Sequence, residues 1–551
     1  MASEASAPSL LLALPDPCLV AVLQCCAVAD QHSLFSAARA HSRLHEAAVL
    51  ALRSIATVVR AQQQMDDVVL YLSKHSHNVN SIELAGPEAA SMELDRKTHQ
   101  LQLHAPSLQQ LPPNLQLESL QLERLCLQLQ PGAGFQGVLG GLAVAALKEL
   151  SIKGCKVVDD HYSLTEAFEQ LPTSLERLSI DTVCASTSRS LPTTFLQQLQ
   201  QLTYLEIAGV SVHGRGKGSH AWQPLQELTR LVDLRINGAN GKMSGAELVT
   251  ASMLSSMQRL TRLELCCTDK LESGLGLEIE PGAIAGKAQL QHIALHRCVP
   301  CGYGAGATQL LHQLAHMQQL TYLSLADTLR PYRDLPATGA VAFEALTTSS
   351  KLQYLNISGC GLPTGAGQLV FPVGKQLPAL QHLNISSVRH HDTSTGWCQA
   401  ARAPDGSRLV GCCPALQSLD VRRLKHNAKL LVSLPGLSGL HTLHLDASLD
   451  RSSEGKGLEA VCHLTRLRTL ELHVPDDTQE GLLLQLAQLK QLTALTYVSG
   501  MEYARKTTCL IAKVSMVSCR LKNVFWPHVA CDLSPACNCQ GAFACCVVRC
   551  R

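Results

Sequence analysis

Histidine and cysteine side chains gather in one stretch of this 551-residue chain and are the first candidates for chemistry. The stretch 387–413 contains His390, His391, Cys398, Cys412 and Cys413. These side chains are ligands that zinc prefers. Their spacing, however, matches no standard zinc site. We therefore interpret the stretch as a polar surface loop and predict no metal site.

Two further cysteine patterns suggest redox or disulfide chemistry. Cys298 and Cys301 form a C-x-x-C pair, while the last residues contain Cys537, Cys539 and the adjacent Cys545 and Cys546. The terminal group lacks paired C-x-x-C units. Cys298 also occupies a core position of the repeat described below. We therefore predict neither a redox centre nor a metal site.

Other catalytic patterns are also missing from the sequence. The glycine-rich stretch 302–308 has the composition of a phosphate-binding loop, but no lysine follows it. A flexible turn between a strand and a helix explains it better. We find no Ser/His/Asp arrangement and no pair of carboxylates suited to acid–base work. We predict that the chain is not an enzyme and needs no cofactor.

Charge and hydropathy exclude several classes of partner. The chain has 46 basic and 44 acidic residues, for a formal net charge of +2. This balance favours neither nucleic acid nor a membrane surface. No uncharged apolar run reaches the roughly 18 residues of a spanning helix. The first residues, with an acidic and no basic side chain before a short apolar stretch, do not resemble a secretory signal. We therefore expect a cytoplasmic and/or nuclear protein with reduced cysteines.

Without a catalytic site, we expect the chain to act by binding a partner, and a repeated hexapeptide indicates which surface would do so. Residues 202–207, LTYLEI, have the frame Leu-x-x-Leu-x-Leu/Ile, which recurs 24 to 36 residues apart. We count fourteen copies, which begin at Leu122, Leu147, Leu175, Leu202, Leu231, Leu260, Leu290, Leu320, Leu352, Leu380, Leu416, Leu440, Leu467 and Leu492. Self-similarity at this period resembles the leucine-rich-repeat family. The resemblance implies an α/β solenoid, a curved horseshoe of about 14–16 repeats.

The frame predicts which side chains are buried. Side chains of a strand alternate between its two faces, so positions four and six of each frame point into the core, joined by position one. Helix-like segments precede most frames, as at 196–201, 309–319 and 481–491. At the ninth position Cys155, Cys298 and Cys360 are expected to point inward as small apolar groups. We predict strands on the inner side and helices on the outer side.

The rest of the chain is divided around this array. We predict a disordered N-terminus at 1–12, a helical domain at 13–58, and a linker with an N-terminal cap at 59–115. The cap contains degenerate frames at 79–84 and 98–103. The solenoid then spans 116–498. Residues 499–551 form a cysteine-rich tail with no helical or strand period, and we predict that this tail is disordered.

The helical domain carries a short apolar motif. Leu-Pro is followed by aliphatic residues at helical spacing, and the positions are Leu14, Pro15, Leu19, Val22, Leu23 and Leu34. The motif resembles the F-box, although Cys18 and Cys26 stand where that family usually has leucine. The resemblance implies that these residues bind a Skp-family adaptor and, through it, a cullin complex. The chain would then be the substrate-recognition subunit of an SCF-type ubiquitin ligase.

Exposed positions of the frames are candidates for binding a protein target. Position three is Tyr204, Asp233, Arg262, His292, Tyr322, Tyr354 and His382 in successive repeats. Tyr and His combine an apolar ring with a polar tip, which suits interface hot spots. We predict that Tyr204, His292, Tyr322, Tyr354 and His382 contact an unidentified protein target on the concave face.

A second candidate surface is basic. It consists of Arg389, Arg422, Arg423, Lys425 and His426, and we include Arg422 and Arg423 among the target-binding residues. Such a cluster could receive an acidic or phosphorylated segment. A solvated charged rim is the competing interpretation. For the whole chain, the alternative to a ligase subunit is a leucine-rich-repeat interaction scaffold with no ubiquitin role.

Overall fold

The computed structural model divides the chain into two compact units, which are described separately. Unit 1 consists of Met1–Glu247, Ser252–Arg259 and Thr268–Lys270, and unit 2 consists of Leu248–Ala251, Leu260–Cys267 and Leu271–Arg551. The structure describes residues 14–29, 44, 47–48, 54–58, 62–75, 79–86, 102–103, 115–128, 146–158, 168–169, 171–181, 184–185, 191–210, 212–213, 222–238, 247–267, 277–301, 303–329, 343–362, 366–391, 398–400, 406–424, 428–446, 459–474, 486, 489–499, 523–526 and 547–550.

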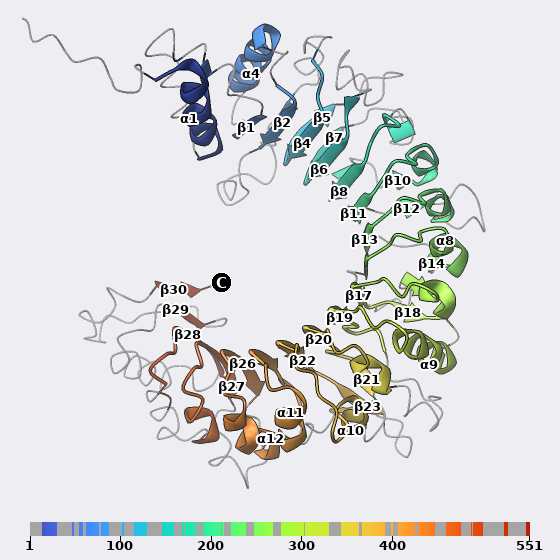
Figure 1. The fold of residues 1–551 in the computed structure, drawn as a ribbon, viewed down its shortest axis with the longest axis vertical. Coiled ribbons are helices and arrows are strands. Elements are labelled where there is room, and N and C mark those ends of the chain that lie inside the picture. Colours follow the sequence, from blue (N-terminus) through green and yellow to red (C-terminus); the bar gives the residue numbers. More distant parts are fainter. Residues whose placement is uncertain are drawn as a thin grey trace, which may run out of the picture. The chain divides into compact units, whose positions relative to one another are not determined.

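Unit 1 contains one long parallel sheet with one strand per repeat (Figure 1). Its strands pair in the order β1 (Ser54–Val58), β2 (Ser81–Ala85), β4 (Ser119–Glu123), β6 (Glu149–Lys153), β8 (Arg177–Asp181), β11 (Tyr204–Val210) and β13 (Asp233–Gly238). The register aligns equivalent frame positions, as where Leu205 pairs with Leu178 and Leu234. The repeat predicted from the hexapeptide is therefore confirmed as a structural unit.

Shorter elements follow the strands of unit 1. They are the parallel pairs of a second sheet, β3 (Gln102–Leu103), β5 (Cys126–Gln128), β7 (Lys156–Val158) and β9 (Cys184–Ala185), the pair β10 (Leu191–Pro192) and β12 (Val212–His213), and the 3-10 helices η4 (Thr194–Gln198) and η5 (Gln223–Glu227). The helices α1 (Asp16–Ala29) and α4 (Gln62–His75) precede them. The predicted helix at 196–201 is thus a short 3-10 turn.

Two frame assignments in unit 1 need correction. The first full frame lies at 117–122 rather than 122–127, because Leu117, Leu120 and Leu122 are buried and β4 ends at Glu123. The degenerate frame at 98–103 is also wrong. Its last residues form β3, which pairs with β5 in the second sheet. The frame at 79–84 is confirmed by β2, whose Ile82 and Leu84 are buried.

Unit 2 repeats the same architecture. Its parallel strands pair in the order β15 (Arg262–Cys266), β17 (His292–His296), β19 (Tyr322–Ser324), β20 (Tyr354–Asn356), β22 (His382–Asn384), β25 (Ser418–Asp420), β26 (Thr442–Asp446), β27 (Thr469–Val474) and β28 (Ala494–Ser499). We call the sheet face that carries positions three and five of these strands the open face.

Helices and short strands lie on the other side of the unit 2 sheet (Figure 1). The helical segments are η7 (Pro281–Ile284), α9 (Tyr303–Leu314), α10 (Ala366–Val370), α11 (Gly406–Cys412), α12 (Ala428–Ser433) and η9 (Leu434–Gly436). The short strands are β16 (Leu277–Ile279), β18 (Val299–Pro300), β21 (Gly361–Leu362), β23 (Arg389–His391) and β24 (Cys398–Ala400). Two short elements, β14 (Glu247–Val249) and α8 (Ala251–Ser255), fall where the chain is divided between the units. The predicted helix at 309–319 is part of α9, whereas 481–491 lies mostly outside the described residues.

The core consists of the frame positions that the sequence singled out. Leu320, Leu323 and Leu325, at positions one, four and six of one repeat, are 3%, 0% and 0% exposed. The ninth position is also internal. Cys298 and Cys360 are fully buried, and their thiols donate hydrogen bonds to the carbonyl oxygens of residues 265 and 325 at 3.1 and 3.0 Å. Burial raises the pKa of both thiols. These cysteines are structural, as predicted.

Eight of the described repeats have a left-handed residue at position eight, in the turn after the strand. The positive φ angles there belong to Arg124, Gly154, Gly209, Arg297, Asp327, Gly359, Ser387 and Arg423. Glycine adopts this conformation without the Cβ clash that other residues meet. At Gly359 it is also required by space, because a Cβ would lie 1.9 Å from an oxygen of Asp327 in the preceding repeat. Successive turns are therefore packed against one another.

The predicted domain boundaries differ from the structure at both ends. The sheet begins with β1, inside the range 13–58 that was predicted as a separate helical domain, because β1 pairs with β2. The sheet also continues into the predicted disordered tail, where β29 (Asn523–Trp526) pairs with β28 and with β30 (Val547–Cys550). An edge strand offers unpaired backbone groups, so a further strand can join it without a leucine pattern. The range 1–12 lies outside the described residues. Among described helices, none is long and apolar enough to cross a membrane.

Candidate functional site

Four ring side chains form a continuous row across the open face of unit 2. They are His292, Tyr322, Tyr354 and His382, which occupy position three of four successive repeats. The first two rings stack with centroids 3.8 Å apart, and the two tyrosines stack with centroids 4.2 Å apart and planes within 5°. His382 lies 6.0 Å from Tyr354 and is tilted by 39°. We call these four side chains the aromatic row, and the structure confirms the predicted juxtaposition.

The stacking determines what the aromatic row can offer to a partner. Both faces of the Tyr322 ring are covered, one by His292 and the other by Tyr354. Only ring edges and the polar tips therefore remain for contact. Burial, followed by the neighbouring Tyr354, raises the pKa of the Tyr322 hydroxyl. Tyr322 thus remains a neutral hydroxyl that can both donate and accept hydrogen bonds.

A carboxylate holds one end of the aromatic row. Glu264 on β15 lies 2.8 Å from Nε2 of His292, and the Nε atom of Arg262 donates to the same carboxylate at 3.1 Å. Burial by itself raises the pKa of Glu264. The hydrogen bonds from His292 and Arg262 and the charge of Arg262 outweigh burial, and they lower the pKa from its ordinary value of 4.5 to about 2. The first ring of the row is therefore fixed by an ionised group.

This pKa shift predicts a pH-dependent contribution to stability. A carboxyl whose pKa is lower in the folded chain stabilises it above the unfolded pKa. That contribution is therefore complete above about pH 4.5 and is lost as the pH falls towards 2. After allowance for solvent screening, we expect about 1–2 kcal/mol from Glu264 at neutral pH. The measurement is the free energy of unfolding of the wild type and Glu264→Gln between those two pH values. The difference in unfolding free energy between the wild type and Glu264→Gln should shrink as the pH falls. A difference that stays constant would contradict the assigned role of Glu264.

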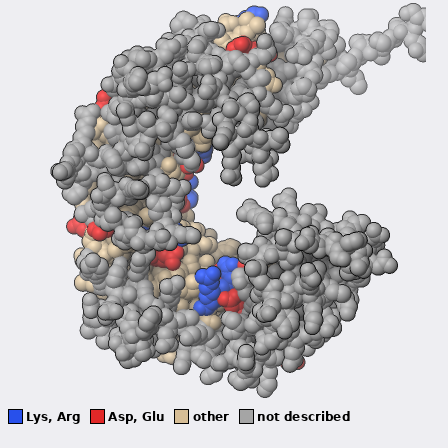
Figure 2. Space-filling model, turned by 180° about the vertical axis from the view of Figure 1, so that it is seen from behind, with Lys and Arg blue, Asp and Glu red and all other residues tan. Residues whose placement is uncertain are grey.

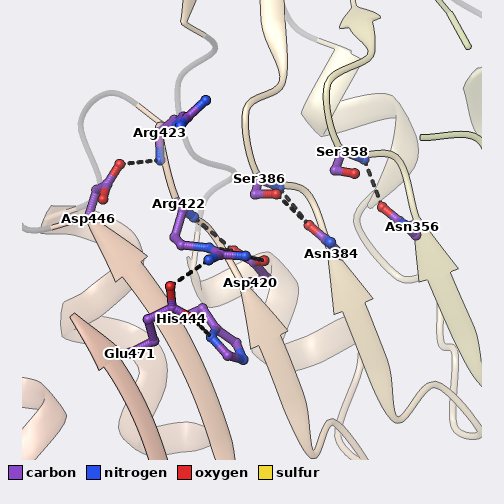
Figure 3. A network of polar contacts seen from close by, with 10 residues as sticks. All are labelled: Asn356, Ser358, Asn384, Ser386, Asp420, Arg422, Arg423, His444, Asp446 and Glu471. Carbon is purple, nitrogen blue, oxygen red and sulfur yellow. Dashed lines mark hydrogen bonds and ion pairs between the residues drawn. The ribbon is translucent and has the colours of Figure 1, made fainter. Parts of the chain in front are cut away.

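A charge network lies further along the same unit (Figure 3). Arg422, at position seven of its repeat, donates from Nε and Nη2 to the two oxygens of Asp420 at 3.0 and 2.6 Å. Its Nη1 donates to Glu471 at 2.6 Å, and the other Glu471 oxygen lies 2.6 Å from Nδ1 of His444. Hydrogen bonding to Asp420, against the opposing effect of burial, raises the pKa of Arg422. We call Asp420, Arg422, His444 and Glu471 the charge network.

The charge network corrects the predicted basic patch. The positive charge of Arg422 is satisfied by two carboxylates, so it is not available to an acidic partner. Arg423 has an exposed side chain, while its backbone N–H donates to Asp446 at 2.8 Å. The side chain of Arg389 and residues 425 and 426 lie outside the described residues. On the described surface, basic and acidic side chains lie beside one another (Figure 2).

Polar side chains close the turns that follow β20, β22 and β25 (Figure 3). The Oδ1 atoms of Asn356 and Asn384 accept the backbone N–H groups of Ser358 and Ser386, both at 3.0 Å. Asp420 accepts the N–H of Arg422 in the same way at 3.2 Å. All three acceptors occupy position five of their repeats. Side chains of this kind favour such local turns because their short carbonyl arms reach the N–H group two residues on.

Comparisons with known proteins add little to these observations. No family model matches the chain, and no curated protein matches it. Among solved structures, one similar chain is that of the "Crystal structure of TLR13-ssRNA13 complex", at 15% identity and a TM-score of 0.39. The match covers 88% of this chain and 63% of that chain. The leucine-rich-repeat fold assigned here therefore rests on the repeated strands and turns of the chain itself.

Tyr204 does not belong to the aromatic row. It lies in unit 1, where the guanidinium groups of Arg177 and Arg235 stand 4.4 and 5.1 Å from its ring centroid. Its hydroxyl donates to Glu206 at 3.0 Å. Burial first, and then Glu206, raises the pKa of Tyr204 to about 12. This ring is thus held by its own neighbours and is not part of the aromatic row, contrary to the prediction.

The predicted adaptor-binding residues divide into buried and exposed positions. Leu19 is fully buried in the chain and Leu23 is 3% exposed, so neither is free to contact an adaptor as predicted. A helix packed on its own chain must bury one apolar stripe, and these two residues supply it. Pro15 and Val22 are exposed, and Leu14 is partly exposed. Leu34 lies outside the described residues.

The structure describes the side chains of only part of the sequence candidates for metal chemistry. Cys412 and Cys413 are buried, and burial raises the pKa of both thiols. The backbone of His391 pairs with that of Cys398 in an antiparallel hairpin, and these side chains lie outside the description. Within the described part of the chain, no group of three His, Cys, Asp or Glu side chains could hold a metal ion.

Position five is the signal that the sequence analysis overlooked. It supplies Glu264, Asn356, Asn384, Asp420, His444 and Glu471, on the same face as position three. A strand places residues two apart on one face, so the two positions had to be considered together. In unit 2 the carboxylates at position five, Glu264, Asp420 and Glu471, each contact an arginine at position three or seven.

Proposed function

We propose that the chain is a repeat-based interaction protein that binds a protein partner through the open face of unit 2. The observation that carries this proposal is the aromatic row, whose rings are aligned by strand register and fixed by stacking. A surface whose side chains are already fixed loses little conformational entropy on binding. Tyrosine and histidine also supply the apolar area and polar tips that hot spots need.

The test of this proposal removes the centre of the aromatic row. Tyr322→Ala combined with Tyr354→Ala should weaken partner binding by about 2 kcal/mol or more, which is roughly 30-fold. The control is Thr442→Ala with Thr469→Ala, which changes position three in two other repeats of the same sheet. Binding is measured by titration with the partner, and folding by circular dichroism. If the variant Tyr322→Ala with Tyr354→Ala folds and still binds the partner normally, the binding surface lies elsewhere.

We further propose that the chain delivers its partner to a cullin–RING ubiquitin ligase, as the F-box-like segment implies. The support is the motif itself together with two exposed side chains, Pro15 just before α1 and Val22 on α1. Such a subunit would act by raising the effective concentration of the target near the ligase. The alternative is a scaffold without a ubiquitin role, in which α1 only adjoins the repeats.

Adaptor binding can be tested without disturbing the core. Val22 is 39% exposed, so Val22→Asp should abolish co-purification of the Skp-family adaptor and cullin while leaving the chain folded. A charge in an apolar contact must be desolvated without a partner, which is costly. The matched control is Leu70→Asp on α4, where the leucine is 56% exposed. If the wild type retains no adaptor, or if Val22→Asp retains it fully, the scaffold alternative holds.

A further inference from the structure

We propose that the segment recognised by the aromatic row is an uncharged, extended peptide, and not an acidic or phosphorylated one. This inference rests on the proposed function and specifies the class of partner. Three observations support it: the open face around the aromatic row lacks charged side chains, the faces of the aromatic rings are covered by neighbouring rings, and the row has the length of a short extended peptide.

The open face carries no formal charge across four repeats. Positions two, three, five and seven of the strands β17, β19, β20 and β22 contain no Asp, Glu, Lys or Arg. They are Gln291, His292, Ala294, His296, Thr321, Tyr322, Ser324, Ala326, Gln353, Tyr354, Asn356, Ser358, Gln381, His382, Asn384 and Ser386. Ala294, Ser324, Asn356 and Ser386 are buried, and the remaining amides, hydroxyls and imidazoles match neutral hydrogen-bonding groups.

Three cations at the borders of this stretch, Arg262, Arg297 and Arg422, are matched within the chain. On one side Glu264 contacts both Arg262 and His292. On the other side Arg422 lies between Asp420 and Glu471. At the turns Arg297 pairs with Asp327 at 3.6 Å. A phosphate or carboxylate placed on the row would lose its water without gaining a cation in return, which is unfavourable.

The use of the ring faces favours a peptide over a sugar as the neutral partner. A pyranose ring would need an open aromatic face, but Tyr322 is covered on both sides and Tyr354 is covered on one. The partly exposed edges and hydroxyls of Tyr322 and Tyr354 instead suit the N–H and C=O groups of a peptide backbone. The row spans three intervals between strands, or about 14 Å, which matches roughly four to five residues of extended chain.

The test selects binders from an unbiased peptide library on the purified full-length chain. We expect enriched peptides to have no net charge over their core. Their affinity should change less than about twofold between about 50 and 500 mM NaCl, because screening acts on charges. Phosphorylated counterparts of the same peptides should bind more weakly. Tyr322→Phe with Tyr354→Phe, which keeps the stacked rings but removes both hydroxyls, should weaken binding by about tenfold.

The outcomes separate this inference from the proposed function. If the enriched peptides are acidic, or bind better when phosphorylated, yet still depend on the two tyrosines, the inference fails and the proposed function stands. The inference also fails if no peptide is enriched while neutral glycans on an array bind in a tyrosine-dependent way. If the enriched peptides bind equally well to Tyr322→Ala with Tyr354→Ala, then both the inference and the proposed binding face fail.

Discussion

Leu355→Ala is expected to destabilise unit 2 by about 2–5 kcal/mol, because Leu355 is fully buried at position four of its repeat. The change removes buried apolar atoms and leaves a cavity that the packed neighbouring repeats cannot fill completely. The adjacent Tyr354 points to the open face, so Tyr354→Ala should cost only about 0.5–1.5 kcal/mol from lost stacking. Denaturant unfolding of the full-length variants measures both losses of stability.

The comparison of these two neighbours tests the register of the sheet. A shift of one residue would exchange the two faces of every strand. In that case Tyr354→Ala would cost more than Leu355→Ala. The control is Val432→Ala on α12, where the side chain is 57% exposed, and it should change stability by about 0.5 kcal/mol or less.

Asp420→Ala is expected to lower the free energy of unfolding by about 2–3 kcal/mol. The carboxylate is 7% exposed and accepts hydrogen bonds from the side chain and the backbone N–H of Arg422. Its removal leaves a half-buried guanidinium with only Glu471, and the loss of one partner from a buried pair is costly. Asp420→Asn should cost less, because asparagine at the equivalent positions 356 and 384 makes the same turn hydrogen bond.

Chemical denaturation of the two Asp420 variants separates turn formation from ion pairing. Arg423→Ala is the control, since the Arg423 side chain is exposed and only its backbone N–H bonds to Asp446. We expect that control to change the free energy of unfolding by about 0.5 kcal/mol or less. Equal losses for Asp420→Ala and Arg423→Ala would mean that the charge network adds nothing to stability.

The sequence predicted the strands and the aromatic row because both follow from one repeated register. Tyr322 and Tyr354 occupy the same frame position, so parallel pairing places their rings side by side. The first frame was misplaced because 117–122 and 122–127 share Leu122 and fit the same pattern. Pairing of β4 with β2 and β6 decides between them, and that information is not local.

The charge network and the burial of α1 could not be predicted for a related reason. Arg422 and Glu471 are 49 residues apart, and their contact depends on how the strands β25 and β27 align across β26, which lies between them. From the sequence, Arg422 looked like one member of a basic group. Likewise, an apolar stripe such as Leu19 and Leu23 predicts a covered helix face, but not whether the cover is the chain itself or a partner.

The central claim is that a protein partner binds the aromatic row, and site-specific photocrosslinking tests it most directly. A photoreactive phenylalanine analogue would replace Tyr354 in one variant of the full chain and Val432 in another. Val432 lies on α12, away from the open face, and is exposed. We predict that a partner crosslinks at position 354 and not at position 432. Equal crosslinking at both positions, or crosslinking at 432 alone, would contradict the assignment of the open face as the binding surface.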